Sequence, residues 1–269
     1  MNSHGTFAET LHGGGALGCW SNFASFACVE LMTSLGFDFV VLDMQHSEIT
    51  RSHFPSVLGA FSGAKCFSVV RAAANDYHLI NWLCDLGVDG VLVPMVNSAE
   101  DARRAVQAAK YPPVGRRSFG PLRAARYGSA MESYMERPDS HTALIVQIED
   151  ARAAENAHEI VAVAGVDAVF VGPNDIAFSM LKQGERVKAN PGEWTAFART
   201  PEVLGLCALV MERARQAGIP FGMTAGSYAE AHDWLRRGAS FATYGSDFMF
   251  LRAGAQHLCR PAISEVRTK

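Results

Sequence analysis

An α/β fold, a single (β/α)8 TIM barrel, is predicted by three features of the sequence. Eight short apolar runs recur along the chain, and amphipathic helical patterns separate most of them. Apolar strands that alternate with helices indicate a parallel sheet whose outer face is covered by the helices. A length of 269 residues also suits one barrel of this type, whose usual size is about 250 residues. We therefore expect residues 1–269 to form one barrel domain.

The predicted strands follow one another in chain order. They span residues 16–20, 37–43, 66–71, 89–94, 143–149, 167–172, 219–224 and 241–245. Of the segments between them, residues 98–109 and 203–217 show clear helical periodicity. A Leu-Gly-x-Asp or Ala-Gly-x-Asp pattern leads into the second, fourth and sixth strands, with a weaker copy before the eighth. This even spacing favours a closed barrel, and the glycine suits the left-handed position that ends a helix.

Two irregular segments, residues 112–138 and 182–200, interrupt this alternation. The first is rich in Arg, Gly and Pro, and the second combines charges with Gly and Pro and has little periodicity. Because they come after the fourth and sixth strands, we expect both to begin on the face where the strands end. In a barrel of this type, that face carries the active site.

Composition and charge exclude several classes of function. The formal net charge of −3 does not indicate the basic surface that nucleic-acid binding requires. No apolar run approaches the ~20 residues of a membrane span. Residues 1–10 lack the pattern of a secretory signal. The six cysteines form no C-x-x-C pair, which indicates a reduced, cytoplasmic protein. We expect small molecules as ligands, with neither nucleic acid nor membrane as a partner.

Polar side chains end four of the apolar strands. The second strand ends in Asp43 and is followed by His46, the third ends in Arg71, the fifth ends in Glu149, and the sixth leads into Asp175. A barrel would bring these strand ends to one mouth. Charged groups at such a place are costly unless they are paired or bind a metal ion.

Glu149 and Asp175 are the best candidates for metal ligands. Two carboxylates without a nearby thiolate suit a hard divalent cation, namely Mg²⁺, Mn²⁺ or Co²⁺. Two protein ligands leave positions for a bidentate substrate and water. The alternative is that each carboxylate caps a helix or pairs with an arginine, but their placement after neighbouring strands favours the metal site.

His46, Arg71 and Asp43 complete the candidate catalytic group. Histidine side chains exchange protons readily at pH 7. Arg71 can bind a carboxylate or an enolate oxygen in a fork geometry; the alternative is a structural ion pair with an acid at a strand end. Asp43 can orient the site through hydrogen bonds, or it can act only as an N-cap or turn residue.

The remaining motifs separate this chemistry from others. The turn formed by Gly172, Pro173 and Asn174 could offer backbone N–H groups to a substrate carboxylate, although such turns are common. None of the five lysines falls at the carboxyl end of a predicted strand, where a Schiff-base mechanism needs one. No dinucleotide motif opens a helix after a strand, and no nucleophile elbow or Walker motif is present.

Six segments, taken together, carry a family resemblance. They are residues 43–46 (DMQH), 70–71 (VR), 91–96 (VLVPMV), 110–117 (KYPPVGRR), 146–149 (VQIE) and 170–175 (FVGPND). In this order they resemble the HpcH/HpaI aldolases, which are class II pyruvate aldolases that include 4-hydroxy-2-oxoheptanedioate aldolase. The resemblance runs from about residue 18 to about residue 250.

The resemblance implies a role for each part of the site. Glu149 and Asp175 would ligate the divalent metal with Gln147 close to it, and pyruvate would chelate that metal. The backbone of Gly172, Pro173 and Asn174 would hold the pyruvate carboxylate.

For the catalytic group, the resemblance implies that Arg71 stabilises the enolate oxygen, His46 transfers protons and Asp43 supports the site. It also implies a homo-oligomer, a hexamer or trimer of paired barrels in which the last helix is exchanged between subunits. An acid matching Asp85 would then come from a neighbouring subunit and hydrogen-bond His46. The alternative for Asp85 is a surface carboxylate before the helix-ending Gly87.

Some positions depart from the family pattern. Many relatives have Glu where Gln45 stands, residues 180–200 form a longer segment, Ile176-Ala177 replaces the usual Leu-Ser, and residues 223–225 replace a more aliphatic stretch. These differences concern the aldehyde more than the chemistry.

The predicted function is a metal-dependent aldolase. It would cleave a 4-hydroxy-2-oxo acid to pyruvate and an aldehyde through a metal-stabilised pyruvate enolate. One alternative is a decarboxylase or other lyase for 2-oxo acids such as oxaloacetate, which would need the same enolate but no aldehyde pocket. Another is a non-catalytic metabolite-binding barrel, which would not need a proton-transferring histidine.

Overall fold

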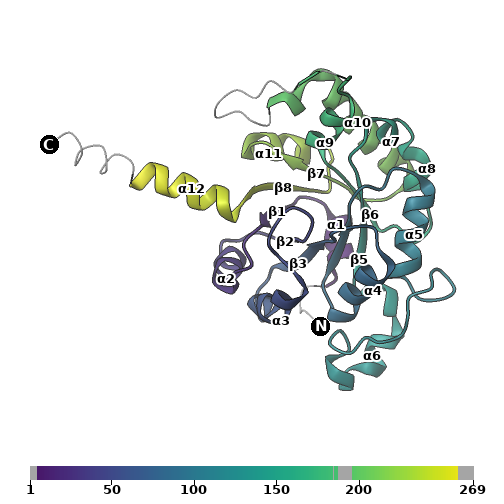
Figure 1. Ribbon diagram of the computed structural model, residues 1–269. Helices are drawn as coiled ribbons and strands as arrows, with labels where there is room; N and C mark the ends of the chain where they lie inside the picture. Colours follow the sequence, from purple (N-terminus) through teal and green to yellow (C-terminus); the bar gives the residue numbers. More distant parts are fainter. Residues whose placement is uncertain (1–4, 184, 187–195, 260–269) are drawn as a thin grey trace.

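The computed structural model describes residues 5–183, 185–186 and 196–259, and in it eight parallel strands close into a barrel in chain order (Figure 1). The strands are β1 (Ala16–Ser21), β2 (Phe39–Asp43), β3 (Phe67–Arg71), β4 (Gly90–Val93), β5 (Ala143–Ile148), β6 (Ala168–Val171), β7 (Phe221–Ala225) and β8 (Phe241–Ser246). Each coincides with a predicted strand to within two residues at either end. The predicted (β/α)8 barrel is therefore confirmed.

Helices lie between the strands and at both ends of the chain, and most of them cover the outside of the barrel. They are α1 (Phe7–Gly13), α2 (Phe26–Ser34), α3 (Phe54–Val57), α4 (Tyr77–Leu86), α5 (Ala99–Ala109), α6 (Met131–Glu136), α7 (Ala151–Glu155), α8 (Ala157–Val161), α9 (Pro173–Ser179), α10 (Pro201–Ala217), α11 (Tyr228–Arg236) and α12 (Asp247–Leu258). The chain begins its helices where side chains can cap them: Ser98 accepts a hydrogen bond at the start of α5, and Thr200 does so before Pro201 in α10. Among the described residues, no helix is both long and apolar enough to cross a membrane.

Three glycines of the repeated pattern, Gly36, Gly87 and Gly238, follow the end of a helix within two residues, as expected, whereas Gly165 lies four residues after α8. Gly36, Gly87, Gly165 and Gly238 have φ angles of 88°, 74°, 97° and 105°, a region that side chains with a Cβ rarely adopt. The strands that follow are β2, β4, β6 and β8, so the repeat marks alternate units of the barrel.

The barrel interior is filled by side chains, and α1 contributes two of them. Phe7 and Leu11 are fully buried, and the Phe7 ring lies 5.3 Å from that of Phe39 and 5.2 Å from that of Phe67. Helix α1 was not predicted from the sequence. Its contribution to the core is one reason why a polar site can form only at the opposite, carboxyl end of the strands.

One irregular segment lies on the face opposite to the predicted one. Residues 112–138 follow α5 rather than β4, and they connect the end of that helix to the start of β5. A helix in such a unit returns the chain to the amino ends of the strands, so the expectation that this segment begins at the catalytic face was wrong. Here it forms α6, and its Ala125 and Tyr134 pack into a small cluster with Tyr111, which immediately precedes the segment.

The other irregular segment, residues 182–200, lies partly outside the described residues, which exclude 184 and 187–195. Its last part forms a 3₁₀ turn, Ala196–Arg199, in which Phe197 packs against Phe178 of α9 at 5.1 Å. Arg199 donates a hydrogen bond to the carbonyl of Thr224 in β7. The end of this segment therefore lies at the carboxyl face of the barrel.

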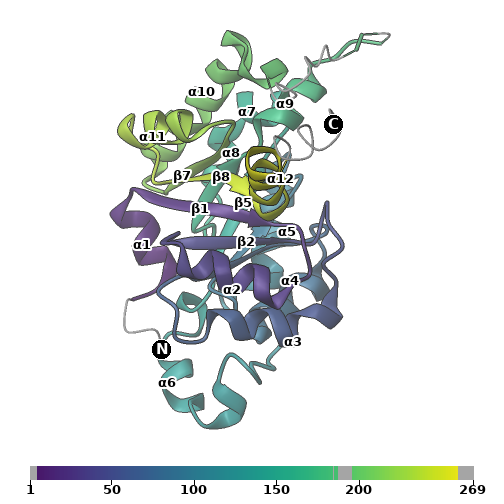
Figure 2. The ribbon, with the colours of Figure 1, turned by 90° about the vertical axis from the view of Figure 1, so that its left-hand side faces the viewer.

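Helix α12 extends away from the barrel (Figures 1 and 2). Asp247 is its only buried residue, whereas Leu251 is 66% and Leu258 is 73% exposed. The exchange of this helix between subunits stays a prediction.

Candidate active site

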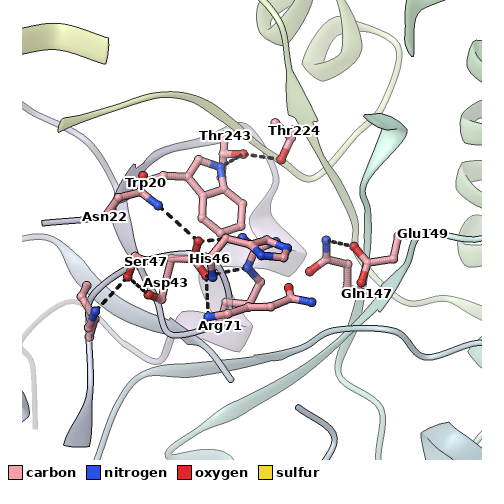
Figure 3. Close-up of polar contacts among 12 residues, drawn as sticks. Trp20, Asn22, Asp43, His46, Ser47, Arg71, Gln147, Glu149, Thr224 and Thr243 are labelled. Atoms are coloured by element: carbon pink, nitrogen blue, oxygen red, sulfur yellow. Dashed lines mark hydrogen bonds and ion pairs between the residues drawn. The ribbon is translucent and has the colours of Figure 1, made fainter. Parts of the chain in front are cut away.

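Arg71 and Asp43 form a buried ion pair at the mouth of the barrel. They are the last residues of neighbouring strands and lie opposite each other in the register of β2 and β3. Arg71 Nε donates to Asp43 Oδ1 at 2.9 Å, and Nη2 donates to Oδ2 at 2.7 Å (Figure 3). The predicted alternative for Arg71, an ion pair with a strand-end acid, is thus part of the site. It fixes the guanidinium and leaves Nη1 without a partner among the described residues.

Asp43 organises the turn that carries His46. Its Oδ1 accepts the backbone N–H groups of Gln45 at 3.0 Å and His46 at 3.3 Å, and its Oδ2 accepts Asn22 Nδ2 at 3.2 Å. Burial alone would raise the pKa of Asp43, but the hydrogen bonds and charge of Arg71 and the two backbone donors lower it below its ordinary value. Asp43 is therefore a turn residue and an orienting carboxylate at the same time.

Trp20 and Thr243 form a second support for Arg71 that the sequence analysis missed. The guanidinium carbon lies 4.5 Å from the centre of the Trp20 ring, within the range of a cation–π interaction. Trp20 Nε1 donates to Thr243 Oγ1 at 2.9 Å, and the hydroxyl of Thr243 lies 3.1 Å from that of Thr224 (Figure 3). The available signal was the single aromatic residue of β1, whose other residues are Ala, Leu, Gly, Cys and Ser.

His46 is exposed to solvent beside this pair. Its backbone is fixed by Asp43, and within the described part of the chain its imidazole forms no hydrogen bond. The ring is therefore accessible to a substrate at the mouth.

Glu149 lies directly after β5 and is 3% exposed. Its Oε1 accepts Met95 N at 2.7 Å, and its Oε2 accepts Gln147 Nε2 at 2.7 Å. Burial is the main cause that raises the pKa of Glu149 to about 7, and the negative charges of Asp175 and Asp43 raise it further. The hydrogen bond from Met95 and the positive charge of Arg71 act in the opposite direction and lower it. These charge interactions reach across the mouth from β2 and β3 to β5.

The residues around Glu149 fit a hard divalent cation. Asp175 is exposed in the first turn of α9, and its charge acts on Glu149. Gln147 Oε1 is buried without a hydrogen-bond partner. In the part of the chain that the structure describes, no three His, Cys, Asp or Glu side chains gather around a common point. The oxygen donors that this part of the mouth would offer a cation are two carboxylates and one amide oxygen, a set that would suit Mg²⁺ or Mn²⁺ with water or substrate completing the shell.

Gly172 allows the chain to approach these donors. A Cβ at this position would lie 3.0 Å from Gln147 Nε2 and 3.2 Å from Glu149 Oε2. Of the three residues in the predicted carboxylate-binding turn, Gly172 already donates its N–H to Ile148 O at 3.2 Å, and Pro173 has no N–H. The N–H group of Asn174 is thus the one backbone donor of this turn that a substrate carboxylate could use.

Arg199 is a further residue of this wall that the sequence analysis did not identify. It donates from Nη1 to Asn174 Oδ1 at 3.1 Å, from Nη2 to Thr224 O at 3.3 Å and from Nε to Glu230 Oε2 at 3.1 Å. These bonds join the ends of β6 and β7 to α11. An arginine at the end of an aperiodic segment gave no signal by itself.

Asp85 lies near the end of α4 and forms an ion pair within its own chain. Arg117 Nη2, on a nearly buried side chain, donates to Asp85 Oδ1 at 2.7 Å. Within its own chain, Asp85 forms no hydrogen bond with His46. Its Oδ2 is left without a hydrogen-bond partner among the described residues.

Comparison with known proteins gives the family. The model of HpcH/HpaI aldolase/citrate lyase matches residues 16–253. This chain belongs to that family. It is therefore an enzyme of the aldolase and lyase type, which cleaves carbon–carbon bonds and acts on 2-oxo acids.

Similar proteins span nearly the whole chain. A 2-dehydro-3,6-dideoxy-6-sulfogluconate aldolase of Pseudomonas putida is 35% identical over 243 residues, covering 90% of both chains. A hydroxypyruvate/pyruvate aldolase of Chromohalobacter salexigens is 33% identical over 251 residues, covering 93% of this chain and 94% of the other. The crystal structure of a family protein from Burkholderia cenocepacia J2315 superimposes with a TM-score of 0.83 at 28% identity, covering 97% and 98% of the two chains.

Proposed function

We propose that this protein catalyses the reversible cleavage of a 4-hydroxy-2-oxo acid to pyruvate and an aldehyde, as a cytoplasmic homo-oligomer that uses a divalent cation. The main support is one arrangement: a guanidinium fixed by Asp43 and Trp20 faces the same mouth as the buried carboxylate of Glu149. The names of both aldolases compared above describe substrates or products of the same chemical class.

Glu149 and Asp175 would hold the cation, with Gln147 Oε1 as a neighbouring donor. When bound, Mg²⁺, Mn²⁺ or Co²⁺ would act as a Lewis acid that polarises the keto group of the 2-oxo acid. The support is the donor set itself, since Glu149 is a buried carboxylate with no cationic hydrogen-bond partner among the described residues.

Arg71 would stabilise the oxygen at C2 as negative charge develops there. During cleavage the 4-hydroxyl group loses its proton and becomes the carbonyl of the aldehyde as the C3–C4 bond breaks. The electron pair of that bond forms the C2=C3 double bond and leaves negative charge on the C2 oxygen, and uptake of a proton at C3 then gives pyruvate. Arginine cannot lose its charge, and its orientation is already set by Asp43 and Trp20. The stabilising charge therefore needs no reorganisation during the reaction.

His46 would accept the 4-hydroxyl proton. Its exposed imidazole on a turn fixed by Asp43 supports this role. The turn at Gly172, Pro173 and Asn174 would receive the substrate carboxylate, with the N–H of Asn174 as its backbone donor.

Asp85 would complete the site of a neighbouring subunit. Its free Oδ2 would accept a hydrogen bond from that subunit's histidine, equivalent to His46, and so fix the tautomer of the imidazole. Asp85→Asn should then change kcat and its pH profile without changing the oligomer mass in light scattering. A fully active monomer would contradict this part of the proposal.

The experiment for the whole proposal is a substrate panel with added Mn²⁺ or Mg²⁺. Pyruvate release from several 4-hydroxy-2-oxo acids, together with the reverse aldol addition, is the expected result. Turnover of oxaloacetate alone would indicate a decarboxylase instead, and binding without turnover of any compound would indicate a non-catalytic barrel.

A further inference from the structure

Asp247 is a buried carboxylate whose hydrogen bonds lead toward the active site. It follows β8 as the first residue of α12, and it has no lysine or arginine partner within the described residues. Its Oδ2 accepts Ser21 Oγ at 3.0 Å, Asn22 N at 2.9 Å and Phe23 N at 2.9 Å, and its Oδ1 accepts Phe248 N at 2.8 Å. A buried charge balanced only by hydrogen bonds depends on all of its donors.

An acid at the start of a helix is common, because it interacts favourably with the helix dipole. Only Phe248, among the four donor residues, belongs to α12. The other three lie at the end of β1 and in the loop after it. The carboxylate therefore does more than cap its own helix: it holds the β1–α2 loop against the end of β8.

Asn22 continues this connection to the catalytic pair. While its backbone N–H is bound by Asp247, its side-chain Nδ2 donates to Asp43 Oδ2 at 3.2 Å (Figure 3). The same oxygen accepts Arg71 Nη2 at 2.7 Å. A continuous series of hydrogen bonds thus joins the carboxyl ends of β8, β1, β2 and β3.

The physical consequence concerns the orientation of Asp43. Its Oδ1 accepts hydrogen bonds from Gln45 N, His46 N and Arg71 Nε, whereas among the described residues its Oδ2 accepts only Arg71 Nη2 and Asn22 Nδ2. Without Asn22, Oδ2 keeps Arg71 as its sole partner, so this side of the carboxylate loses its neutral anchor and can tilt together with the guanidinium. Small rotations matter, since a charge stabilises a developing oxyanion only over a narrow range of positions.

We propose that Asp247 is a positioning residue for Arg71: it fixes the β1–α2 loop so that Asn22 holds the carboxylate of Asp43. This inference rests on the role of Arg71 in the proposed function.

The test compares Asp247→Asn, Asn22→Ala and the double variant, each saturated with Mn²⁺. Pyruvate methyl proton exchange and kcat of cleavage should fall about tenfold in each single variant, with KM for the 2-oxo acid changed less than about twofold, the pattern for a loss confined to the transition state. The double variant should be no slower than the slower single variant, because both act through one connection.

Ser246→Ala is the matched control. Ser246 caps the same helix through Met249 N at 3.4 Å, and in the described structure its side chain forms no hydrogen bond with the β1–α2 loop. This variant should lower the melting temperature and leave kcat unchanged, which separates a loosened helix from a displaced Arg71.

Wild-type kcat in a folded Asp247→Asn variant, or additive losses in the double variant, would overturn the inference. If Asp247→Asn does not fold, Asn22→Ala is combined with Arg71→Lys: no further loss beyond Arg71→Lys supports the connection, and a full additional loss rejects it. Failure of the proposed function has a separate readout: the Arg71→Ala variant would then exchange the methyl protons of pyruvate at the wild-type rate.

Discussion

The guanidinium of Arg71 lies over the indole of Trp20, with its central carbon 4.5 Å from the ring centre, while two of its nitrogens bind Asp43. A planar cation that stacks on one partner and forms a fork with another has its position and its plane fixed together. Lysine has a point charge on a flexible stem and cannot reproduce either contact.

Arg71→Lys should therefore reduce activity even though the charge is kept. We expect kcat to fall at least about tenfold in Arg71→Lys and about a hundredfold or more in Arg71→Ala, the scale for loss of one oxyanion donor. Pyruvate proton exchange in D₂O, followed by NMR, should fall in parallel because enolate formation precedes any use of the aldehyde. Exchange at the wild-type rate in Arg71→Ala would remove this residue from the enolate step.

Glu149 should make the stability of the metal-free protein depend on pH. Its pKa is about 7 in the folded protein against an ordinary value of 4.5. Between these two pH values the folded state keeps the proton of Glu149, whereas the unfolded state has released it. The free energy of unfolding is therefore unaffected by Glu149 below about pH 4.5 and decreases as the pH rises from there to about pH 7. Above about pH 7 the decrease is complete and amounts to roughly 3 kcal/mol. Urea unfolding from pH 5 to pH 8 should show this decline in the wild type but not in Glu149→Gln. Equal slopes in the two proteins would contradict the assignment.

The same proton should compete with a divalent cation. Binding to the carboxylate requires its release, so the apparent affinity for Mn²⁺ should increase up to about pH 7 and then level off. Titration calorimetry at pH 6, 7 and 8 measures this directly, and Asp175→Asn should weaken binding at every pH. Chelation should abolish activity and Mn²⁺ should restore it. Full activity in a protein verified to be free of metal would rule out the proposed cofactor.

Gly172→Ala should disturb the metal donors without unfolding the barrel. The new Cβ would lie 3.0 Å from Gln147 Nε2 and 3.2 Å from Glu149 Oε2, so both side chains must shift by a few tenths of an ångström. We expect Mn²⁺ affinity to fall about tenfold, the lower end for altered neighbours of metal ligands. Gly205→Ala in α10 is the control, because its Cβ would meet no atom within 4 Å and alanine favours a helix. Equal Mn²⁺ affinity in the two variants would show that the close approach of Gly172 is not required.

The sequence by itself determined the barrel and the residues at its mouth. Apolar runs of strand length alternate with helical patterns, and this periodicity is local, so all eight strands could be recognised without tertiary information. The placement of Asp43, Arg71 and Glu149 at strand ends followed from the same runs. Family membership then agreed with the resemblance seen in six short segments.

Only the tertiary structure decided which atoms of the site meet. The stacking of Trp20 on Arg71, the hydrogen bond from Asn22 to Asp43 and the four donors around Asp247 join residues from separate strands or distant loops, and spacing along the chain does not fix such distances. The raised pKa of Glu149 depends on burial and on charges carried by other strands. Likewise, residues 112–138 lie at the amino ends of the strands because α5 first reverses the chain, and the direction of that helix, not the composition of the segment, sets the face.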